Sequence, residues 1–299
     1  MRIIRYIDDQ NKKQLAAVTN ENKVFDLPFD NFLSLVNHAQ QQGKSPQQVI
    51  SEKIYQGDSG FQLDQLHLTA PIDAPEVWAA GVTYEKSKEA RNYEATQGKL
   101  DSKTFYDKVY NAERPEIFFK STAARTVGPN DHVFLRSDSN WQIPEPELGL
   151  VIDSMGTVLG YTIGNDMSCR DIEGENPLYL PQAKVWKNSC SIGPTILLAE
   201  AVKNPYEMEM TCRIFRNDEK LFEGNARISQ LKRKLEELIS YLILDNEIFD
   251  GTVLLTGTCI VPPNDFTLQD NDRIEIEIPG IGVLSNPVKE QKSVVKSGN

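Results

Sequence analysis

Short runs of residues that favour β-strands recur from residue 116 onward, and this pattern constrains the fold more than any other feature. The runs are rich in Val, Ile, Leu and Phe, which suit the half-buried surface of a pleated sheet. Among them, apolar side chains at helical spacing predict one long helix over 228–244. We therefore expect a β-rich domain with a core-packing helix. The predicted strands are 116–120, 132–135, 148–152, 158–163, 208–215 and 273–278.

The first 75 residues depart from this pattern and predict a small α/β domain. Two helices are expected, because apolar residues recur at helical spacing over 29–41 and Ser45-Pro46 is a common helix start. Prolines 71 and 75 interrupt the chain and place a domain boundary at 69–75. The fold class expected for the whole chain is α+β. Strands are predicted at 2–7, 14–19 and 23–27, a second domain at 76–288, and a flexible charged tail at 289–299.

The segment 84–111 is polar and helix-prone, with few apolar residues to bury. One interpretation is a solvated helical excursion. The other is a mobile cover over a ligand site, because such covers are often polar segments that become ordered when a ligand binds. Composition does not decide between the two.

Composition does exclude several classes of function. The 299 residues carry 32 basic and 43 acidic side chains, a net charge of −11, whereas a nucleic-acid-binding surface needs a basic face. The four cysteines lack CxxC spacing, which suits free thiols in a reducing compartment. No secretory signal and no run of about 18 apolar residues is visible. We expect a cytoplasmic protein that binds a small molecule and neither nucleic acid nor membrane.

Two carboxylates precede the run 148–152 in a Glu-Pro-Glu sequence. Residues two apart on a strand point to the same face, so Glu145 and Glu147 are expected to project together. Neighbouring carboxylates repel each other unless a cation neutralises them. Asp166 follows the run 158–163 in a Gly-Asn-Asp turn and adds a third carboxylate. This set predicts a site for a hard cation with oxygen ligands, Mg2+ first and Mn2+ or Ca2+ as alternatives.

A lysine and an Arg-Asp pair follow these carboxylates in sequence. Lys184 suits the carboxylate of a small oxo acid, although a surface lysine is the simpler interpretation of this residue alone. Arg170 and Asp171 are expected to pair with each other and brace the turn behind Asp166. The three histidines lie far apart in sequence, so zinc is a poorer candidate than magnesium.

Three segments carry a resemblance to a known family. They are Pro-Glu-Pro-Glu-Leu-Gly-Leu-Val-Ile at 144–152, Gly-Tyr-Thr-Ile-Gly-Asn-Asp-Met-Ser-Cys-Arg-Asp at 160–171 and Gln-Ala-Lys at 182–184. In this order they resemble the fumarylacetoacetate hydrolase family, and the likeness covers residues 76–288. The resemblance implies a small N-terminal domain, a mixed β-rich catalytic domain, and assembly as a homodimer or higher homo-oligomer.

The resemblance also implies roles for individual residues. Lys184 matches the lysine that contacts bound oxo acid and adds positive charge during catalysis, and Thr258 matches a turn beside the substrate carboxylate. Ser87 stands where members that hydrolyse carbon–carbon bonds often carry a histidine that activates water. Without this base, elimination of water is more reasonable chemistry than hydrolysis. The metal ligands of the family correspond to Glu145, Glu147 and Asp166.

Further segments resemble the family members that dehydrate 2-keto-3-deoxy sugar acids. The expected reaction removes a C3 proton and the C4 hydroxyl from a 2-keto-3-deoxy pentonate of the D-arabinonate type and gives 2,5-dioxopentanoate. The alternatives are acylpyruvate hydrolysis, oxaloacetate decarboxylation or isomerisation within the same superfamily, and a catalytically silent oxo-acid-binding protein. The segments are Glu-Val-Trp at 76–78, Arg-Pro-Glu-Ile-Phe-Phe-Lys at 114–120, Arg-Ser-Asp-Ser at 136–139, Glu-Asn-Pro-Leu-Tyr-Leu-Pro at 175–181 and Thr-Gly-Thr at 256–258.

The groups that move protons are the least defined part of the predicted site. Glu116 opens an apolar strand, so burial would raise its pKa and suit it to acid–base catalysis. Lys120, at the other end of that strand, is a candidate either for binding substrate hydroxyls or for pairing with a carboxylate. Glu85 and Ser87 would complete the site if the segment 84–111 closes over it.

Overall fold

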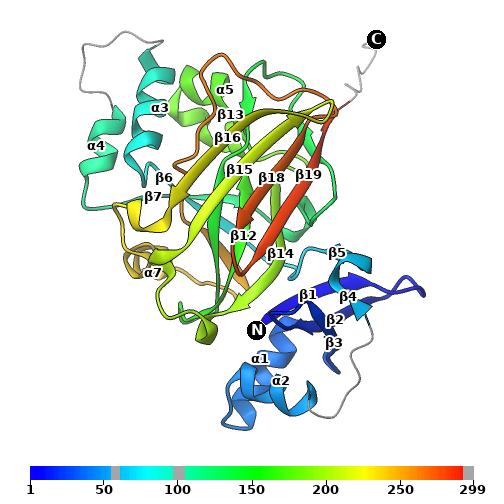
Figure 1. The fold of residues 1–299 in the computed structure, drawn as a ribbon. Helices are drawn as coiled ribbons and strands as arrows, with labels where there is room; N and C mark the ends of the chain where they lie inside the picture. The colour runs from blue at the N-terminus through cyan, green and yellow to red at the C-terminus, as the bar shows by residue number, and fades with distance from the viewer. Residues whose placement is uncertain (55–60, 97–104, 292–299) are drawn as a thin grey trace, which may run out of the picture.

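Two β-sheets dominate the computed structural model, which describes residues 1–54, 61–96 and 105–291 (Figure 1). Twelve described strands form the larger sheet. Its path is β4 (Phe61–Gln62), β3 (Lys23–Asp26), β2 (Lys13–Val18), β1 (Arg2–Ile7), β14 (Cys190–Leu198), β12 (Val158–Asp166), β11 (Pro146–Ile152), β17 (Thr252–Leu255), β6 (Val77–Gly81) and β7 (Glu116–Ser121). Beside this path, β5 (His67–Thr69) pairs with β1 and β8 (Thr126–Val127) with β14.

A second sheet of five described strands lies across one face of the larger sheet (Figure 1). Its β15 alternates buried and less buried residues, as expected of a strand with one face on a core. The order of the sheet is β16 (Glu219–Arg227), β15 (Glu209–Arg216), β18 (Arg273–Ile278), β19 (Gly282–Glu290) and β9 (Val133–Leu135), and a separate ribbon pairs β10 (Gln142–Ile143) with β13 (Ser168–Cys169).

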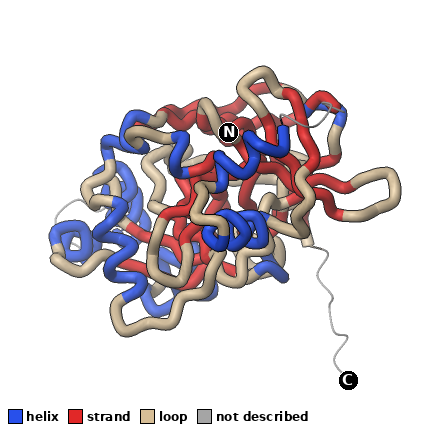
Figure 2. Tube along the Cα trace, turned by 90° about the horizontal axis from the view of Figure 1, so that it is seen from below, coloured by secondary structure: helices blue, strands red, loops and turns tan. Residues whose placement is uncertain are grey.

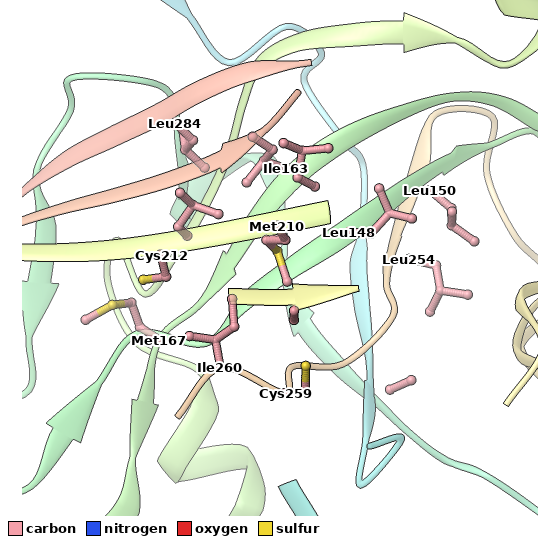
Figure 3. Close-up of a cluster of buried hydrophobic side chains, with 14 of the residues drawn as sticks. Leu148, Leu150, Ile163, Met167, Met210, Cys212, Leu254, Cys259, Ile260 and Leu284 are labelled. Carbon is pink, nitrogen blue, oxygen red and sulfur yellow. The ribbon is translucent and has the colours of Figure 1, made fainter. Parts of the chain in front are cut away.

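The main hydrophobic core fills the space between the two sheets. Leu148 and Ile163 belong to the larger sheet, and Cys212 and Leu284 to the smaller one; all four lie in one cluster and are fully buried (Figure 3). Apolar burial contributes about 25 cal/mol per Å2, so a core of this extent holds the sheets firmly together. Because β11 and β12 supply part of this core, the residues at their ends are held in fixed positions.

The N-terminal unit is joined to the rest of the molecule through the larger sheet. β1 pairs with β14 in antiparallel register, with Arg2 opposite Leu197 and Ile3 opposite Ile196. A second hydrophobic cluster contains residues of both parts, such as Ile3 and Phe32 together with Val253. β5 ends at Thr69 and β6 begins at Val77, and the domain boundary at 69–75 stays a prediction.

The helices lie mostly at the periphery of the strands (Figure 2). α1 is capped by Asn31, whose side chain accepts a hydrogen bond of 2.9 Å from the amide of Ser34. No helix in the described ranges is long and apolar enough to cross a membrane. The helix bounds are α1 (Phe32–Gln41), α2 (Pro46–Ile54), α3 (Glu85–Thr96), α4 (Phe105–Asn111), α5 (Arg170–Glu175), α6 (Leu180–Lys184) and α7 (Leu235–Ile243).

The predicted strands are present, with ends that differ from the prediction by at most three residues, and both N-terminal helices are confirmed. The long helix predicted over 228–244 is wrong, because α7 begins only at Leu235. Ile228–Gln230 forms a 3-10 turn instead, and the amide of Lys232 donates to the carbonyl of Thr83 at 3.0 Å. This stretch is therefore tied to the segment that follows β6 and cannot continue the helix.

Two strands that carry no prediction contain an internal proline. Pro194 lies in β14 and Pro287 in β19, and proline is disfavoured inside strands because it lacks a backbone donor. β19 also includes Lys289 and Glu290, which were expected to belong to the tail; residues 292–299 of that tail lie outside the described residues.

Candidate metal centre

Three carboxylates meet where β11 and β12 run side by side. Glu145 directly precedes β11, Glu147 is its second residue, and Asp166 is the last residue of β12. The antiparallel register places Glu147 opposite Gly164, and the amide of Asp166 donates to the carbonyl of Glu145 at 2.9 Å. One ligand atom from each carboxylate lies within 4.8 Å of the others. All three side chains are buried, with residue exposures of 5, 2 and 1% in sequence order.

Positive groups surround this triad. The Nζ atom of Lys184, which is fully buried at the end of α6, contacts Asp166 Oδ2 at 3.3 Å and also donates to Glu145 Oε2. The Nη2 atom of Arg170 donates to Glu145 Oε1 at 2.9 Å. The expected pairing of Arg170 with Asp171 is therefore wrong. Asp171 instead accepts two hydrogen bonds of 2.6 Å, one from the hydroxyl of Ser139 and one from the backbone amide of Asn140.

The backbone after β17 helps to fix the side chain of Glu147. The amide of Gly257 donates to Glu147 Oε2 at 2.6 Å. Gly257 has a φ of +98°, and a Cβ at this position would lie 1.8 Å from Thr83 Oγ1, so the approach requires glycine. The adjacent Thr258 lines the same cavity as the triad.

Burial and mutual repulsion change the proton affinities of the triad. Burial, only partly offset by the charge of Lys184, raises the pKa of Glu145 to about 7. Burial and the charges of Asp166 and Glu145 raise the pKa of Glu147 well above its ordinary value. Burial alone would lower the pKa of Lys184, but Asp166 and Glu145 outweigh it and the net shift is upward. Without a metal ion, burial and mutual repulsion therefore favour the protonated form of these two glutamates.

The triad fits a hard divalent cation. Its donors are all carboxylate oxygens, which Mg2+ prefers, and the three ligand atoms are close enough to share one ion. Lys120, Lys184 and Arg170 each contact a carboxylate of the triad, so a bound ion would share these oxygens with three positive side chains. Glu145, Glu147 and Asp166 are the residues of the described chain that would hold the ion.

Lys120 contacts the triad but does not line the cavity. Its Nζ atom contacts Asp166 Oδ1 at 2.6 Å and donates to the carbonyls of Met167, at 2.8 Å, and of Lys184. Two of these contacts are hydrogen bonds to carbonyl oxygens, and the contact with Asp166 is an ion pair. Of the two roles considered for Lys120, the geometry favours pairing with a carboxylate.

Glu116, at the start of β7, does not line the cavity of the triad; it lines a second cavity and packs against Gly81. Its Oε2 atom is buried, has no hydrogen-bond partner among the described residues, and occupies the space that a Cβ on Gly81 would need, at 1.9 Å. Gly81 itself lines the cavity of the triad. Burial raises the pKa of Glu116, while the charge of Arg91 opposes this shift. A buried carboxyl group with a raised pKa is suited to proton transfer.

α3 covers the site with one of its faces. Ser87 and Arg91, four residues apart, both line the cavity, as residues at this spacing share a helix face. The hydroxyl of Ser87 donates to the carbonyl of Tyr84 at 2.7 Å and thereby fixes the start of the helix. The structure does not bring Glu85 to the site, because its side chain is 71% exposed and its nearest partner is Lys88.

Sequence reasoning missed two charged residues of this region. Arg91 of α3 and Glu173 of α5 form a buried ion pair. Glu173 Oε2 also accepts a hydrogen bond of 2.8 Å from the hydroxyl of Ser168. Burial would raise the pKa of Glu173, but Arg91, Lys184 and Arg170 outweigh it and lower the pKa to about 2. The sequence feature that could have identified Arg91 is its spacing of four residues from Ser87, which places both side chains on one face of a helix.

Comparison with known proteins adds an independent line of support. Residues 77–289 match the family described as Fumarylacetoacetate (FAA) hydrolase C-terminal. The 2-dehydro-3-deoxy-D-arabinonate dehydratase of Saccharolobus solfataricus is 50% identical over 234 residues, 78% of this chain and 78% of its own length. A Haloferax volcanii protein with the name "Probable 2-keto-3-deoxyxylonate dehydratase" is 49% identical over 222 residues, 74% of this chain and 75% of its own length.

A solved structure extends the likeness to the fold. It is described as 2-keto-3-deoxy-D-arabinonate dehydratase complexed with magnesium and 2,5-dioxopentanoate. The two structures superimpose with a TM-score of 0.81 at 40% sequence identity, over 98% of this chain and 100% of the other.

Proposed function

This chain belongs to the fumarylacetoacetate hydrolase family, and from this premise we propose that it is a magnesium-dependent dehydratase of a 2-keto-3-deoxy sugar acid. The observation that carries the proposal is the buried triad of Glu145, Glu147 and Asp166 with Lys184 beside it. Two similar proteins are named for the dehydration of five-carbon acids, and the similar solved structure holds magnesium and 2,5-dioxopentanoate. The substrate we infer is 2-dehydro-3-deoxy-D-arabinonate.

The triad and its neighbours would bind the oxo-acid end of the substrate. When bound by the triad, the divalent cation supplies Lewis-acid charge to the keto and carboxylate oxygens. Lys184 holds a second positive charge against the same carboxylates, and Thr258 offers a hydroxyl at the cavity wall. Together these groups favour the negative charge that develops on the keto oxygen when C3 loses a proton.

Glu116 is the residue we assign to proton transfer. As a carboxylate it takes a proton from C3; as a carboxylic acid it returns the proton to the C4 hydroxyl, which leaves as water. The C3–H and C4–O bonds break and a C3–C4 double bond forms, so atoms and charge balance. Transfer of a proton from C5 to C3 then gives an enol, which becomes the aldehyde of 2,5-dioxopentanoate.

The protein is further proposed to act in the cytoplasm as a homodimer or higher homo-oligomer. The four cysteines are buried and free in the structure, which suits a reducing compartment. Leu244 and Phe249 are 55 and 49% exposed and offer apolar surface near the end of α7 for contact between copies. Light scattering coupled to gel filtration tests this assembly, and a single monomeric peak across concentrations would contradict it.

The test of the function is a turnover assay with 2-dehydro-3-deoxy-D-arabinonate and Mg2+, in which 2,5-dioxopentanoate is oxidised by a coupled dehydrogenase. We expect a signal that EDTA abolishes. Glu147→Gln should lose both turnover and Mg2+ binding by calorimetry, whereas Glu219→Gln on the exposed start of β16 should keep both. Turnover of acylpyruvates in place of the sugar acid would instead establish the hydrolase alternative.

The role of Glu116 makes a separate prediction. Glu116→Gln should lower kcat by about 10²- to 10⁴-fold, the usual contribution of general acid–base catalysis, while Mg2+ affinity stays unchanged. Gly81→Ala should give the same pattern, because the new Cβ would displace the carboxylate of Glu116. If either variant turned over substrate at the wild-type rate, Glu116 would have no part in the reaction.

A further inference from the structure

The chain leaves β6 and enters α3 through a turn with an uncommon backbone conformation. Val82, the residue after β6, has a φ of +52°, in a region that β-branched residues rarely adopt. This residue is buried and lines the cavity of the triad. Backbone of this kind persists only where the surrounding structure holds it in place. The contacts of this turn therefore indicate what fixes the start of α3.

Thr83, the next residue, supplies two of these contacts. It is only 1% exposed, and its hydroxyl donates to the carbonyl of Thr256 at 2.8 Å. Its own carbonyl accepts a hydrogen bond of 3.0 Å from the amide of Lys232. Tyr84 follows and packs in the main hydrophobic core, where its carbonyl accepts a hydrogen bond from the hydroxyl of Ser87. The residues that lead into α3 are thus bound to the turn after β17 and packed in the core.

The partner of Thr83 is itself fixed next to the metal centre. The amide and the hydroxyl of Thr256 both donate to the carbonyl of Leu148, at 3.1 and 3.0 Å, and Leu148 follows Glu147 in β11. The adjacent Gly257 donates its amide to Glu147 and lies so close to Thr83 that a Cβ would come within 1.8 Å of the hydroxyl oxygen. The hydroxyl of Thr83 therefore ties the start of α3 to the backbone that supports Glu147.

The character of α3 explains why such a tie matters. The helix is mostly polar, and Ser87 and Arg91 line the cavity from it. Most helical stability in proteins comes from packing of an apolar face, so a polar helix depends more on specific contacts near its ends. The hydrogen bond from Thr83 to Thr256 is a buried contact of this kind, and it leads directly to the metal centre.

We propose that Thr83 is a positioning residue whose hydroxyl holds α3 in place relative to the metal centre, so that ligands bound at the triad also order α3. This inference rests on the proposed function only for the choice of the ligands, Mg2+ and an oxo acid. Loss of the hydroxyl should leave the triad able to bind Mg2+, because Glu147 keeps its hydrogen bond to the amide of Gly257. The response of α3 to the bound ligands should be lost.

The competing explanation is that Thr83 only satisfies a buried carbonyl, while the packing of Tyr84 fixes α3. In that case removal of the hydroxyl would lower the melting temperature and change nothing specific to α3. Thr252 of β17 offers a matched control for this case. It is fully buried, and its hydroxyl has no hydrogen-bond partner among the described residues. Thr252→Ala therefore removes the same atoms as Thr83→Ala without breaking a hydrogen bond.

The experiment combines calorimetry with hydrogen exchange, and neither measurement depends on turnover. In wild type, Mg2+ and 2-oxobutyrate together should slow the exchange of the α3 amides by about tenfold or more. In Thr83→Ala this slowing should largely disappear. The affinity for 2-oxobutyrate should fall by about 3- to 10-fold, the usual effect of one hydrogen bond, while the affinity for Mg2+ stays unchanged. Thr252→Ala should respond like wild type, and Thr83→Ser, which keeps the hydroxyl, should restore the response.

Thermal melting shows whether each variant is folded. If Thr83→Ala does not fold, Thr83→Cys takes its place, because a thiol is a weak donor and should give an intermediate response. A wild-type response of α3 in the variant used, an equal loss in Thr252→Ala, or loss of Mg2+ binding in Thr83→Ala would each overturn the inference.

The outcomes also separate this inference from the proposed function. Wild-type protein that binds neither Mg2+ nor 2-oxobutyrate would overturn both. Wild-type protein that binds both ligands, together with an α3 that responds normally in Thr83→Ala, would overturn the role of Thr83 alone. Failure of the dehydratase assay would leave the binding and exchange results intact, so that result would count against the proposed function and not against Thr83.

Discussion

At the scale of single residues, the site concentrates charge that the fold must hold away from water. Glu145 and Glu147 are buried and close to Asp166, and a buried charge without a partner is costly. The pKa of Glu145 rises to about 7 and that of Glu147 rises well above the ordinary 4.5, both with burial as the largest cause. The folded protein without metal therefore binds protons that the unfolded chain has already lost.

This difference predicts how stability depends on pH. A carboxyl group with a raised folded pKa contributes stability that is fully present below 4.5 and is lost as pH rises through the folded value. In EDTA, the melting temperature should therefore fall between pH 5 and pH 8. Glu173, whose pKa is lowered to about 2, acts in the opposite direction only between about pH 2 and 4.5 and does not affect this window.

Magnesium should flatten this pH profile, because the ion favours the charged carboxylates and competes with their protons. Differential scanning calorimetry at several pH values, with EDTA and with Mg2+, measures both slopes. Glu147→Gln removes one of the shifted groups and should reduce the slope in EDTA. Equal slopes with and without Mg2+ would show that the triad does not bind the ion.

The contacts of single residues also mark what the sequence can predict. Glu145, Glu147 and Asp166 were predicted because each lies in a short segment next to an apolar run that predicts a strand; Asp166, expected in a turn, is the last residue of β12. The partner of Lys120 lies 46 residues away and that of Arg91 lies 82 residues away, and no local pattern indicates such pairs. The assignment of Arg170 to Asp171 was wrong for the same reason, since the adjacent residue was the only partner in view.

At the scale of elements, α3 contributes Ser87 and Arg91 to the lining of the cavity. A cavity of about 10 Å3 has room for a water molecule and none for a five-carbon acid. Ser87 and Arg91 close this cavity from α3, a helix that is mostly polar and contributes little to the hydrophobic core. We propose that α3 opens to admit the substrate and closes over it, in line with the second interpretation of the segment 84–111.

Hydrogen exchange measured by mass spectrometry tests this movement. Backbone amides of α3 should exchange quickly in the free protein and slow by about tenfold or more when Mg2+ and 2-oxobutyrate are both present. α1 packs in the N-terminal unit away from the site, so its exchange should not change and serves as the internal control. Exchange of α3 that is indifferent to the ligands would exclude a moving cover.

Elements differ in how far the sequence predicts them. Many strands with alternating or continuous apolar residues were predicted, because their side chains report directly on burial, but the apolar strands β6 and β17 were missed. β14 and β19 were not predicted, and each contains a proline. α7 was predicted too long because Ile228 and Leu231 follow helical spacing. In the structure those two residues pack from a turn, which is fixed by contacts that are distant in sequence.

At the scale of the whole molecule, the N-terminal unit and the catalytic region share one sheet and one hydrophobic cluster. β1 is the neighbouring strand of β14 in the larger sheet. Residues of β14 such as Ile192 and Ile196 pack in the same cluster as Phe32. We therefore predict that a fragment lacking residues 1–75 does not fold alone. It would expose both an unpaired strand edge and apolar side chains, which promotes aggregation.

Expression of the fragment 76–291 tests this prediction. We expect insoluble protein or a fragment without a cooperative thermal transition, and rescue when the segment 1–75 is produced in the same cells. A soluble monomeric fragment that melts cooperatively and binds Mg2+ would show that the catalytic region is independent. The result would also decide whether the predicted boundary at 69–75 separates two autonomous domains or two parts of one.

The pairing of β1 with β14 determines how late in synthesis this part of the larger sheet can form. A ribosome releases β1 long before β14, which ends at Leu198, so more than 180 further residues must be made before the pair can form. Until then, β2 and β5 are the neighbours that β1 can find. The nascent chain therefore carries an open strand edge for most of its synthesis, the period in which chaperones would be of greatest use to it.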